Sequence, residues 1–478
     1  MSIKTYAITG IKWATLISFV VRMSRFVVTL ILAKMLTPEA FGVLAIGLLI
    51  VNVLNLFREV GLGAALIQKQ EEIEETADTT FFILIIISLI IFSVTGLMSH
   101  RISHFFNNNI SIEIINIFAF SIVITSVSKV HVLMLQKELL YKKQAIAEIS
   151  SIITYCFITI SLALKNFQVW SLVFGYIFSE FVRSLMFIIV SNWHPTLRFS
   201  PKLAKEMLQF GKHVFGSTLL NYIFHNMDQF IVGKFLGNSQ IGFYSFGYRI
   251  SNFPAQNVTK VMGQITISVY SKIQNDVEKI KKAYFKSFKL VSFISTPLLM
   301  AFFFLIPDFF HLYYGQKWDE AIPVMKVLAF YGFFRSLGGV TGNVFIALGK
   351  PFILVRIAGA QLLLVIVPIF LVLKKFGITG IAVIFTFSMV FGVVVAIRMI
   401  NKLLIIRWIE YVSCLKSAIS STIISFLIGK YVFGFLFNTN QIEGFFASCG
   451  LIVFIFFYMN YLFDKKFMVE ITNSIGFK

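Results

Sequence analysis

The amino-acid sequence predicts an all-helical protein that crosses a membrane many times. Of its 478 residues, 58% are hydrophobic and only 13% are charged, and the mean hydropathy is +0.84. A soluble domain has roughly 45–50% apolar and about 25% charged residues. Many runs reach the roughly 20 apolar residues that a helix needs to cross a bilayer, for example "TTFFILIIISLIIFSVTGLM" at 79–98. A soluble fold is therefore excluded.

About fourteen membrane spans can be placed along the chain, with ends good to a few residues. The first apolar run follows lysines, as in a signal peptide, but it continues to Leu36 without a small-residue cleavage pattern. We therefore interpret it as a retained first helix. The expected spans cover residues 10–36, 40–66, 78–99, 112–135, 144–164, 168–190, 206–236, 241–270, 286–307, 321–347, 351–373, 377–401, 411–436 and 442–463.

The distribution of lysine and arginine predicts the orientation of these spans. One set of connections and ends carries twenty cations, including the group at 279–286 and the pair Lys465 and Lys466, whereas the alternating set carries seven. Cations concentrate on the cytoplasmic side of membrane proteins, so both termini are expected to be cytoplasmic. The net charge of +20 then reflects topology and contact with anionic lipid headgroups. The five tryptophans fall near span ends and are expected in an interfacial belt.

A repeat with an offset of 200 residues predicts two related halves. "LAKMLTPEAFGVLAI" at 32–46 matches "VGKFLGNSQIGFYSF" at 232–246, and Lys34, Leu36 and Gly42 each have an identical residue in the second copy. Two further turns repeat in the same order. We expect a six-helix lobe at 1–200, a second at 201–405, and two additional helices with a tail at 406–478. An even number of spans per lobe makes the repeats parallel. The alternative is that turns between any two apolar helices look alike, without a duplication.

Ionisable residues inside the spans are the candidate binding site, because a charge there costs several kcal/mol and usually faces a cavity or a partner. Arg22 and Arg25 lie three apart on one helical face, near mid-membrane. The other candidates are Arg58, Asn221, Arg249, Lys260 and Arg335. We expect those of equivalent spans to form a positive chamber that holds an anionic headgroup, since a guanidinium matches phosphate geometry. Internal pairing that only fastens helices is the alternative, and Glu180 with Arg183 fits it better.

Two acids are candidates for ion coupling. Asp228 lies in the middle of the seventh span, and Glu59 lies deep in the second. Asp228 has two possible roles: it binds a proton or Na⁺, or it neutralises Arg22, Arg25 or Arg249. No cofactor other than such an ion is expected. No metal spacing appears, and the three cysteines lie inside spans as small hydrophobic residues.

An enzyme is not expected. The longest connection is about 15–20 residues, so there is no room for an extramembrane catalytic domain, and no P-loop, HExxH or GxSxG motif occurs. "HLYYGQKWDEA" at 311–321 is interpreted as an interfacial loop. Nucleic-acid binding is disfavoured because the basic residues lie in short loops between spans.

Five segments resemble the Wzx-type polysaccharide flippases, in particular their WzxC-like branch, of the multidrug/oligosaccharidyl-lipid/polysaccharide exporter superfamily. They are "LAKMLTPEAFGVLAI", "EVGLGAALIQKQ", "LQKELLYKK", "STLLNYIFHNMDQFIVGKFLGNSQIGFYSFGYRISNFP" and "IQNDVEKIKKAYFKSF". The resemblance runs from about residue 10 to 375. It implies two lobes that open alternately and a substrate of undecaprenyl pyrophosphate carrying an oligosaccharide repeat unit, in a bacterial inner membrane.

The resemblance also bears on the substrate and the partners. Arg22 matches a cavity arginine of the lipid II flippases of this superfamily, whereas a second such arginine corresponds to Val28 here, which argues against a peptidoglycan role. The polymerase and chain-length proteins of an export pathway are implied partners. The alternatives to a flippase are a drug or cation antiporter with this fold, and a polysaccharide polymerase. The sugar, the coupling ion and the oligomeric state are not determined by the sequence.

Overall fold

The computed structural model describes residues 3–107, 110–196, 198–429 and 442–475. All regular secondary structure in these ranges is helical. The chain divides into two compact units, Met1–Ser245 and Phe246–Lys478. The expected boundaries of the lobes, at residues 200 and 405, remain a prediction, because the units follow packing and the lobes follow the sequence repeat.

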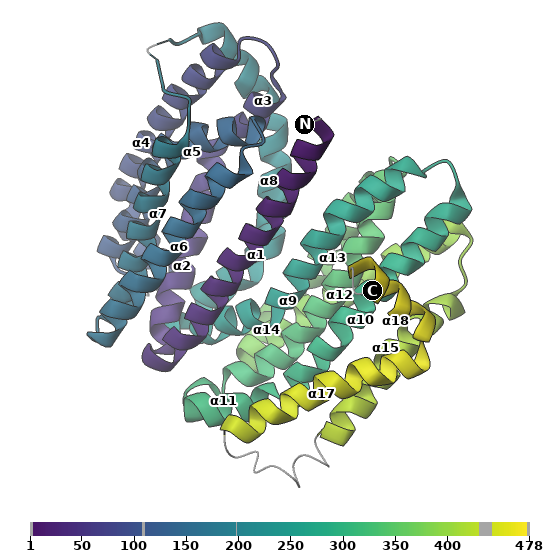
Figure 1. The fold of residues 1–478 in the computed structure, drawn as a ribbon. Coiled ribbons are helices and arrows are strands. Elements are labelled where there is room, and N and C mark those ends of the chain that lie inside the picture. The colour runs from purple at the N-terminus through teal and green to yellow at the C-terminus, as the bar shows by residue number, and fades with distance from the viewer. Residues whose placement is uncertain (1–2, 108–109, 197, 430–441, 476–478) are drawn as a thin grey trace. The chain divides into compact units, whose positions relative to one another are not determined.

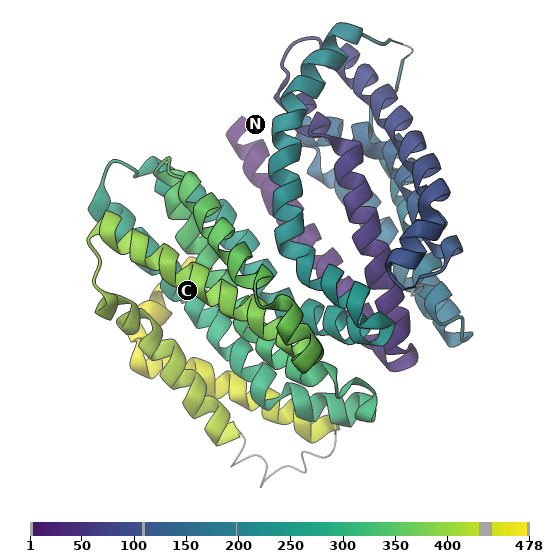
Figure 2. The ribbon, with the colours of Figure 1, turned by 180° about the vertical axis from the view of Figure 1, so that it is seen from behind.

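Unit 1 is a bundle of long helices with one short one. α1 lies along α6, and α6 packs against α7 (Figure 1). Seen from behind, the teal α8 runs beside the purple α2 (Figure 2). The elements are α1 (Ile3–Met35), α2 (Pro38–Glu59), α3 (Leu62–Gln68), α4 (Ile73–Phe105), α5 (Ile112–Lys137), α6 (Tyr141–Leu164), α7 (Val169–Val190), α8 (Pro201–Phe235) and the start of α9 (Gly237–Lys272).

Unit 2 contains the rest of α9 and the following helices. Its main apolar core lies between α10, α12, α14 and α15, around the buried rings of Tyr284 and Phe288. The elements are α10 (Val277–Phe304), α11 (Ile306–Tyr314), the short 3₁₀-helix η1 (Gly315–Trp318), α12 (Ala321–Ala347), α13 (Phe352–Ile366), α14 (Ile369–Leu404), α15 (Trp408–Ile428), α17 (Ile442–Phe463) and α18 (Lys465–Ile475).

Nine helices within the described residues are long and apolar enough to cross a membrane: α2, α4, α5, α6, α7, α10, α14, α15 and α17. α13 is apolar but shorter. The protein is therefore a helical, multi-pass membrane protein, as its composition predicts. That α13 and the four remaining long helices, α1, α8, α9 and α12, also cross, which would bring the number to fourteen, remains a prediction.

Side-chain caps begin several of these helices. The Thr37 hydroxyl accepts a hydrogen bond from the N–H of Ala40 at 3.4 Å at the start of α2, and Pro38 occupies its first turn. Asp276 caps α10 by accepting from the N–H of Lys279 at 3.0 Å. That hydrogen bond lowers the pKa of the Asp276 carboxyl.

The second expected span, 40–66, is not one continuous helix. α2 ends at Glu59, Val60 and Gly61 adopt φ values of 35° and 72°, and α3 begins at Leu62. A left-handed residue stops the α-helical hydrogen-bond ladder, and glycine adopts that conformation without steric cost. Likewise, the backbone at Gly377 (φ 55°, ψ −141°) interrupts α14 next to the loop expected between residues 373 and 377.

The segment at 311–321 and two of the tryptophans differ from expectation. The segment is mostly helical, in α11 and η1, and is not an irregular loop. Trp318 is fully buried with its ring centroid 4.0 Å from that of Phe246, and Trp193 is 8% exposed and packs on Phe81. These two tryptophans therefore fill cores and do not form an interfacial belt, whereas Trp408 is exposed.

The two copies of the repeated turn meet each other inside unit 1. A Cβ added to Gly42 would lie 2.0 Å from the carbonyl oxygen of Asn238, and one added to Gly242 would lie 1.9 Å from that of Pro38. The Ser239 hydroxyl donates to the Glu39 carboxylate. The 200-residue offset converts the contact of Gly42 with Asn238 into that of Gly242 with Pro38, and Glu39 and Ser239 are themselves counterparts. This exchange is the pattern that a local two-fold axis between the turns produces.

We predict that Gly42→Ala and Gly242→Ala each destabilise the protein by about 1–3 kcal/mol, because the added methyl group forces two backbones apart. Thermal unfolding of the purified protein in detergent measures this. Gly216→Ala is the matched control: it too replaces a helical glycine, but among the described residues nothing lies within 4 Å of its added Cβ, so helix propensity should stabilise it slightly. Equal unfolding temperatures for all three variants would contradict the close contact.

Candidate functional site

A polar cavity of about 310 Å³ lies within unit 1, between α1, α6 and α7. Its lining contains three guanidinium groups and two carboxylates, so it carries one net positive charge when all of them are ionised. Such a concentration of charge between apolar helices is the mark of a functional site in a membrane protein. The lining residues are Ile17, Ser18, Val21, Arg22, Arg25, Tyr141, Gln144, Ala145, Glu148, Glu180 and Arg183.

α1 contributes the two arginines that the sequence singles out. Arg22 and Arg25 both line the cavity, as their helical spacing predicts for one face. Arg22 is half-buried and Arg25 is exposed. The Thr29 hydroxyl donates to the backbone carbonyl of Arg25 at 2.7 Å, and within the described residues no carboxylate lies within ion-pair distance of the Arg25 guanidinium. Arg25 is thus available to a ligand.

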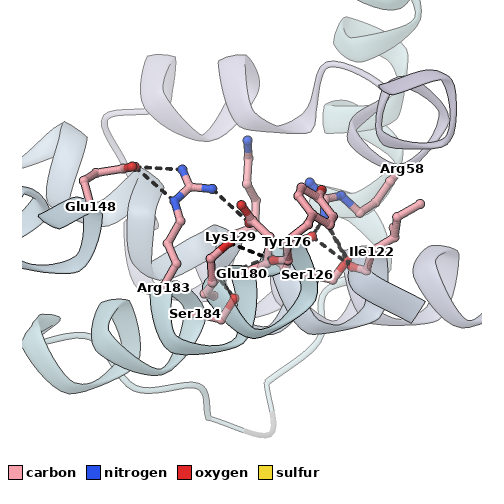
Figure 3. Close-up of polar contacts among 12 residues, drawn as sticks. Arg58, Ile122, Ser126, Lys129, Glu148, Tyr176, Glu180, Arg183 and Ser184 are labelled. Atoms are coloured by element: carbon pink, nitrogen blue, oxygen red, sulfur yellow. Dashed lines mark hydrogen bonds and ion pairs between the residues drawn. The ribbon is translucent and has the colours of Figure 1, made fainter. Parts of the chain in front are cut away.

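Arg183 holds the two carboxylates of the cavity. Its Nε and Nη2 donate to Glu148 Oε1 at 3.0 and 2.8 Å, and its Nη1 donates to Glu180 Oε2 at 3.2 Å. Figure 3 shows the guanidinium between the two acids. The pairing of Glu180 with Arg183 is the one the sequence favoured as a helix fastener, and Glu148 extends it from α7 to α6.

Arg58 is buried against α5 and lies apart from the cavity lining. Only 3% of it is exposed. Its Nη1 donates to the Thr125 hydroxyl at 2.6 Å. It also donates to the Ser126 hydroxyl at 3.3 Å and the Ile122 carbonyl at 3.3 Å (Figure 3). These contacts favour the helix-fastening interpretation for this arginine. Its expected role as a substrate ligand remains a prediction.

Glu59 joins Arg58 to Lys129, a lysine outside the set of candidates predicted from the sequence. Its Oε1 lies 3.3 Å from Arg58 Nη2 and 2.5 Å from Lys129 Nζ. Ser128 directly precedes Lys129 on α5, and its hydroxyl lies 2.9 Å from that of Ser184, which connects α5 to α7. Glu59 therefore already balances two cations, and its ion-coupling role remains a prediction.

Asp228 lies on α8, away from the cavity lining. It is buried, and its Oδ2 accepts from the Tyr244 hydroxyl at 2.8 Å while its Oδ1 accepts from the N–H of Gln229 at 2.8 Å. The first of these contacts ties α8 to the start of α9. Binding of a proton or Na⁺ by Asp228 remains a prediction.

The remaining candidates lie in unit 2 or outside the described side chains. In unit 2 the Arg335 guanidinium donates to the Tyr248 hydroxyl at 3.2 Å and thereby connects α12 to α9. Arg249 is the neighbour of Tyr248 on α9 and is half-buried. The side chains of Asn221 and Lys260 lie outside the part that the structure describes. Convergence of cations from both lobes in one chamber therefore remains a prediction.

Four polar residues of the site were not among the candidates predicted from the sequence, and they lie on α5 and α6. Lys129 completes the Arg58 cluster, and Tyr141, Gln144 and Glu148 line the cavity. The last three lie at positions i, i+3 and i+7 of α6, so they share a helical face. That spacing was a signal in the sequence. A glutamate and a glutamine within a predicted span, one turn apart, mark a face that avoids lipid.

The arrangement suits recognition of an anion and not acid–base catalysis. Both carboxylates are already hydrogen-bonded to Arg183, whereas Arg25 offers a planar pair of donors that fits a phosphate. No group of three or more histidine, cysteine or acidic residues within the described residues is placed to hold a metal ion. The donors that α1 contributes to the cavity therefore match the geometry of a phosphate group.

Comparisons with known proteins give one family and several relatives. A family model described as "Polysaccharide biosynthesis protein" matches residues 31–323. The chain is 24% identical over 353 residues to the lipopolysaccharide biosynthesis protein WzxC of Escherichia coli (strain K12), covering 73% of this chain and 71% of that protein. It is 23% identical to the teichuronic acid biosynthesis protein TuaB of Bacillus subtilis (strain 168), covering 73% of each.

A solved structure has the same fold. The lipid II flippase MurJ, in an inward closed conformation, matches with a TM-score of 0.71 at 14% identity, over 95% of this chain and 98% of that one. At this identity the likeness concerns the fold alone.

We predict that Arg58→Met and Arg25→Gln differ in their effect on stability. Arg58→Met removes four hydrogen bonds from a buried guanidinium, and we expect a loss of about 1.5–3 kcal/mol in the free energy of unfolding. Arg25→Gln changes an exposed side chain, so we expect stability to stay within about 0.5 kcal/mol of the native value. Thermal unfolding in detergent compares them. A larger loss for Arg25→Gln than for Arg58→Met would mean that Arg25, and not Arg58, fastens helices.

Proposed function

The chain belongs to the polysaccharide biosynthesis protein family, and we propose that it flips a lipid-linked oligosaccharide across the membrane. The substrate we propose is undecaprenyl diphosphate carrying an oligosaccharide repeat unit. It moves from the cytoplasmic to the outer face of a bacterial inner membrane, for the synthesis of an exopolysaccharide, an O-antigen or a capsule. Relatives named for lipopolysaccharide and teichuronic acid biosynthesis, and a fold shared with a lipid II flippase, support this class of substrate.

The observation that carries the proposal is the arginine face of α1. An arginine within a membrane span is costly unless water, an acid or a ligand solvates it. Arg25 is exposed and has no ion pair among the described acids, and it shares a cavity with Arg22. A diphosphate supplies the negative charge that Arg25 lacks among the described acids, and two guanidinium groups one turn apart can each bind a phosphate group bidentately. The polyprenyl tail stays in the surrounding lipid.

The proposed cycle is alternating access in a chain of fourteen spans, with two six-helix lobes, two additional C-terminal helices and both termini in the cytoplasm. Opening to one side admits the headgroup to the cationic chamber, and opening to the other releases it. Arg249, Lys260, Arg335 and Asn221 remain proposed chamber residues, and Asp228 and Glu59 remain proposed sites for a coupling proton or Na⁺. A polymerase and a chain-length protein of the same export pathway are proposed partners.

Deletion of the gene tests the proposal directly. We expect lipid-linked repeat units to accumulate on the cytoplasmic face while their synthesis continues, because the step that removes them is lost. Accessibility of the glycan to a membrane-impermeant label, in intact cells and in inverted vesicles, measures the distribution. An unchanged distribution would reject a flippase, whereas normal translocation with shortened glycan chains would indicate a polymerase.

We predict that Arg22→Gln and Arg25→Gln lower the initial rate of flipping by about tenfold or more each. A lost hydrogen bond between charged groups costs about 1.5–3 kcal/mol, and 1.4 kcal/mol corresponds to about tenfold. The initial rate in proteoliposomes, normalised to inserted protein, measures this. Arg101→Gln is the matched control, because Arg101 is exposed on α4 and does not line the cavity. If the normalised rate is unchanged and only the amount of inserted protein falls, the arginines fasten helices.

Within the same assay, Arg25→Lys should recover part of the rate lost in Arg25→Gln. Lysine keeps the charge but lacks the planar pair of donors that binds a phosphate bidentately. A rate for Arg25→Lys as low as that for Arg25→Gln would mean that geometry and not charge dominates at this position.

A further inference from the structure

α6 lines the same cavity as the arginines with a different kind of chemistry. Tyr141, Gln144 and Glu148 lie on one face of this helix and, together with the α1 arginines, line the cavity between α1, α6 and α7. They provide a phenolic hydroxyl, an amide and a carboxylate, which are neutral or negative groups that a diphosphate does not require. The cavity therefore has a cationic side on α1 and a hydrogen-bonding side on α6.

Two hydrogen-bonding atoms on this α6 face have no partner in the part of the chain that the structure describes. Arg183 makes both of its contacts to Glu148 through a single oxygen, Oε1, and across the described ranges Glu148 Oε2 has no hydrogen-bond partner. The Gln144 Nε2 atom is buried and also has no partner among the described residues. A buried amide left without a hydrogen bond costs roughly 1–3 kcal/mol. The pair thus offers one acceptor and one donor, separated by one helical turn.

Sugar hydroxyls fit this pair of atoms, because each hydroxyl both donates and accepts. One ring hydroxyl can donate to Glu148 Oε2 while another accepts from Gln144 Nε2. The size of the cavity limits the ligand: about 310 Å³ lies at the lower end of the roughly 300–1,000 Å³ found for ligand pockets. It therefore suits a single sugar ring beside a phosphate group and not a whole repeat unit.

We propose that Tyr141, Gln144 and Glu148 form a subsite for the first sugar of the substrate, the ring joined directly to the diphosphate. This inference rests on the proposed function. A diphosphate bound by Arg22 and Arg25 would place its attached sugar beside α6, because both helices line one cavity. Arg183 fixes the Glu148 carboxylate in position through two hydrogen bonds to Oε1. The protein would thus select its repeat unit by the identity of the first sugar.

A metal ion is a poorer occupant of this subsite. The two carboxylates of the cavity already contact Arg183, and three guanidinium groups line the same space. The net positive charge repels a cation, whereas an uncharged ring with several hydroxyls is unaffected by it. An ordered water molecule on Gln144 is the simple alternative, and it is an outcome of the test below.

The test compares binding of two kinds of lipid to the full-length protein in detergent. The probes are farnesyl diphosphate and farnesyl diphosphate esterified with glucose, galactose or N-acetylglucosamine. For the native protein we expect at least one sugar-bearing lipid to bind about tenfold more tightly than farnesyl diphosphate. A neutral hydrogen bond is worth roughly 2- to 10-fold in affinity, and two are gained.

The measured ratio is the dissociation constant for farnesyl diphosphate divided by that for the preferred sugar-bearing lipid. Gln144→Leu should reduce this ratio by about 3-fold or more. Tyr141→Phe, which removes only the phenolic hydroxyl, gives a second measurement of the ratio if Gln144→Leu fails to fold. Gln209→Leu is the matched control, since Gln209 is an exposed residue of α8 that does not line the cavity, and its ratio should equal that of the native protein.

The outcomes separate the subsite from the proposed function. If the native protein binds farnesyl diphosphate but prefers none of the three sugar-bearing lipids, the subsite is wrong and the flippase proposal stands. A native ratio retained in both Gln144→Leu and Tyr141→Phe would mean that water and not sugar occupies this face. If the native protein binds none of these lipids, the proposed function itself fails.

Discussion

The cost of placing a guanidinium inside a membrane is the constraint on which the arrangement of unit 1 depends. Such a group requires a hydrogen-bonding or charged partner, and the described side chains meet this requirement in three ways. Arg58 is solvated by hydroxyls and a carbonyl of α5. Arg183 is shared between two carboxylates from α6 and α7. Arg25 instead lies at a cavity. The same chemistry thus fastens helices in two cases and places a charge at a cavity in the third.

These networks form a scaffold that supports the cavity. Breaking a buried ionic contact is costly because it leaves an uncompensated charge, so the contacts of Arg58, Glu59 and Lys129 keep α2 against α5. The Ser128–Ser184 contact then joins α5 to α7, which carries Arg183. A cavity wall that is fixed in this way holds its polar groups in place before a ligand arrives, and this reduces the entropy lost on binding.

Close backbone packing complements the polar contacts where α2 meets the start of α9 and where its end meets α8. Gly42 faces the backbone of Asn238 near the start of α2, and Gly211 faces the carbonyl of Val60 just beyond its end. Between them the Tyr222 hydroxyl donates to the Leu49 carbonyl at 3.0 Å. Glycine allows helices to approach more closely than larger residues do, and without a hydrophobic effect between helices this packing drives their association in lipid. The repeated turn is therefore a packing device as well as a trace of duplication.

The sequence by itself determined the helical membrane fold, the positions of most helices and the presence of arginines within spans, because hydropathy and helical spacing are local properties. It also placed Arg22 and Arg25 on one face and favoured the pairing of Glu180 with Arg183, since both pairs lie within one helix. Only the tertiary structure decided that Glu148 joins Arg183 and that Lys129 joins Glu59. These partners lie 35 and 70 residues apart in the chain, and no local pattern states which helices become neighbours. The break at Val60 and Gly61 and the burial of Trp193 and Trp318 likewise depend on how helices pack.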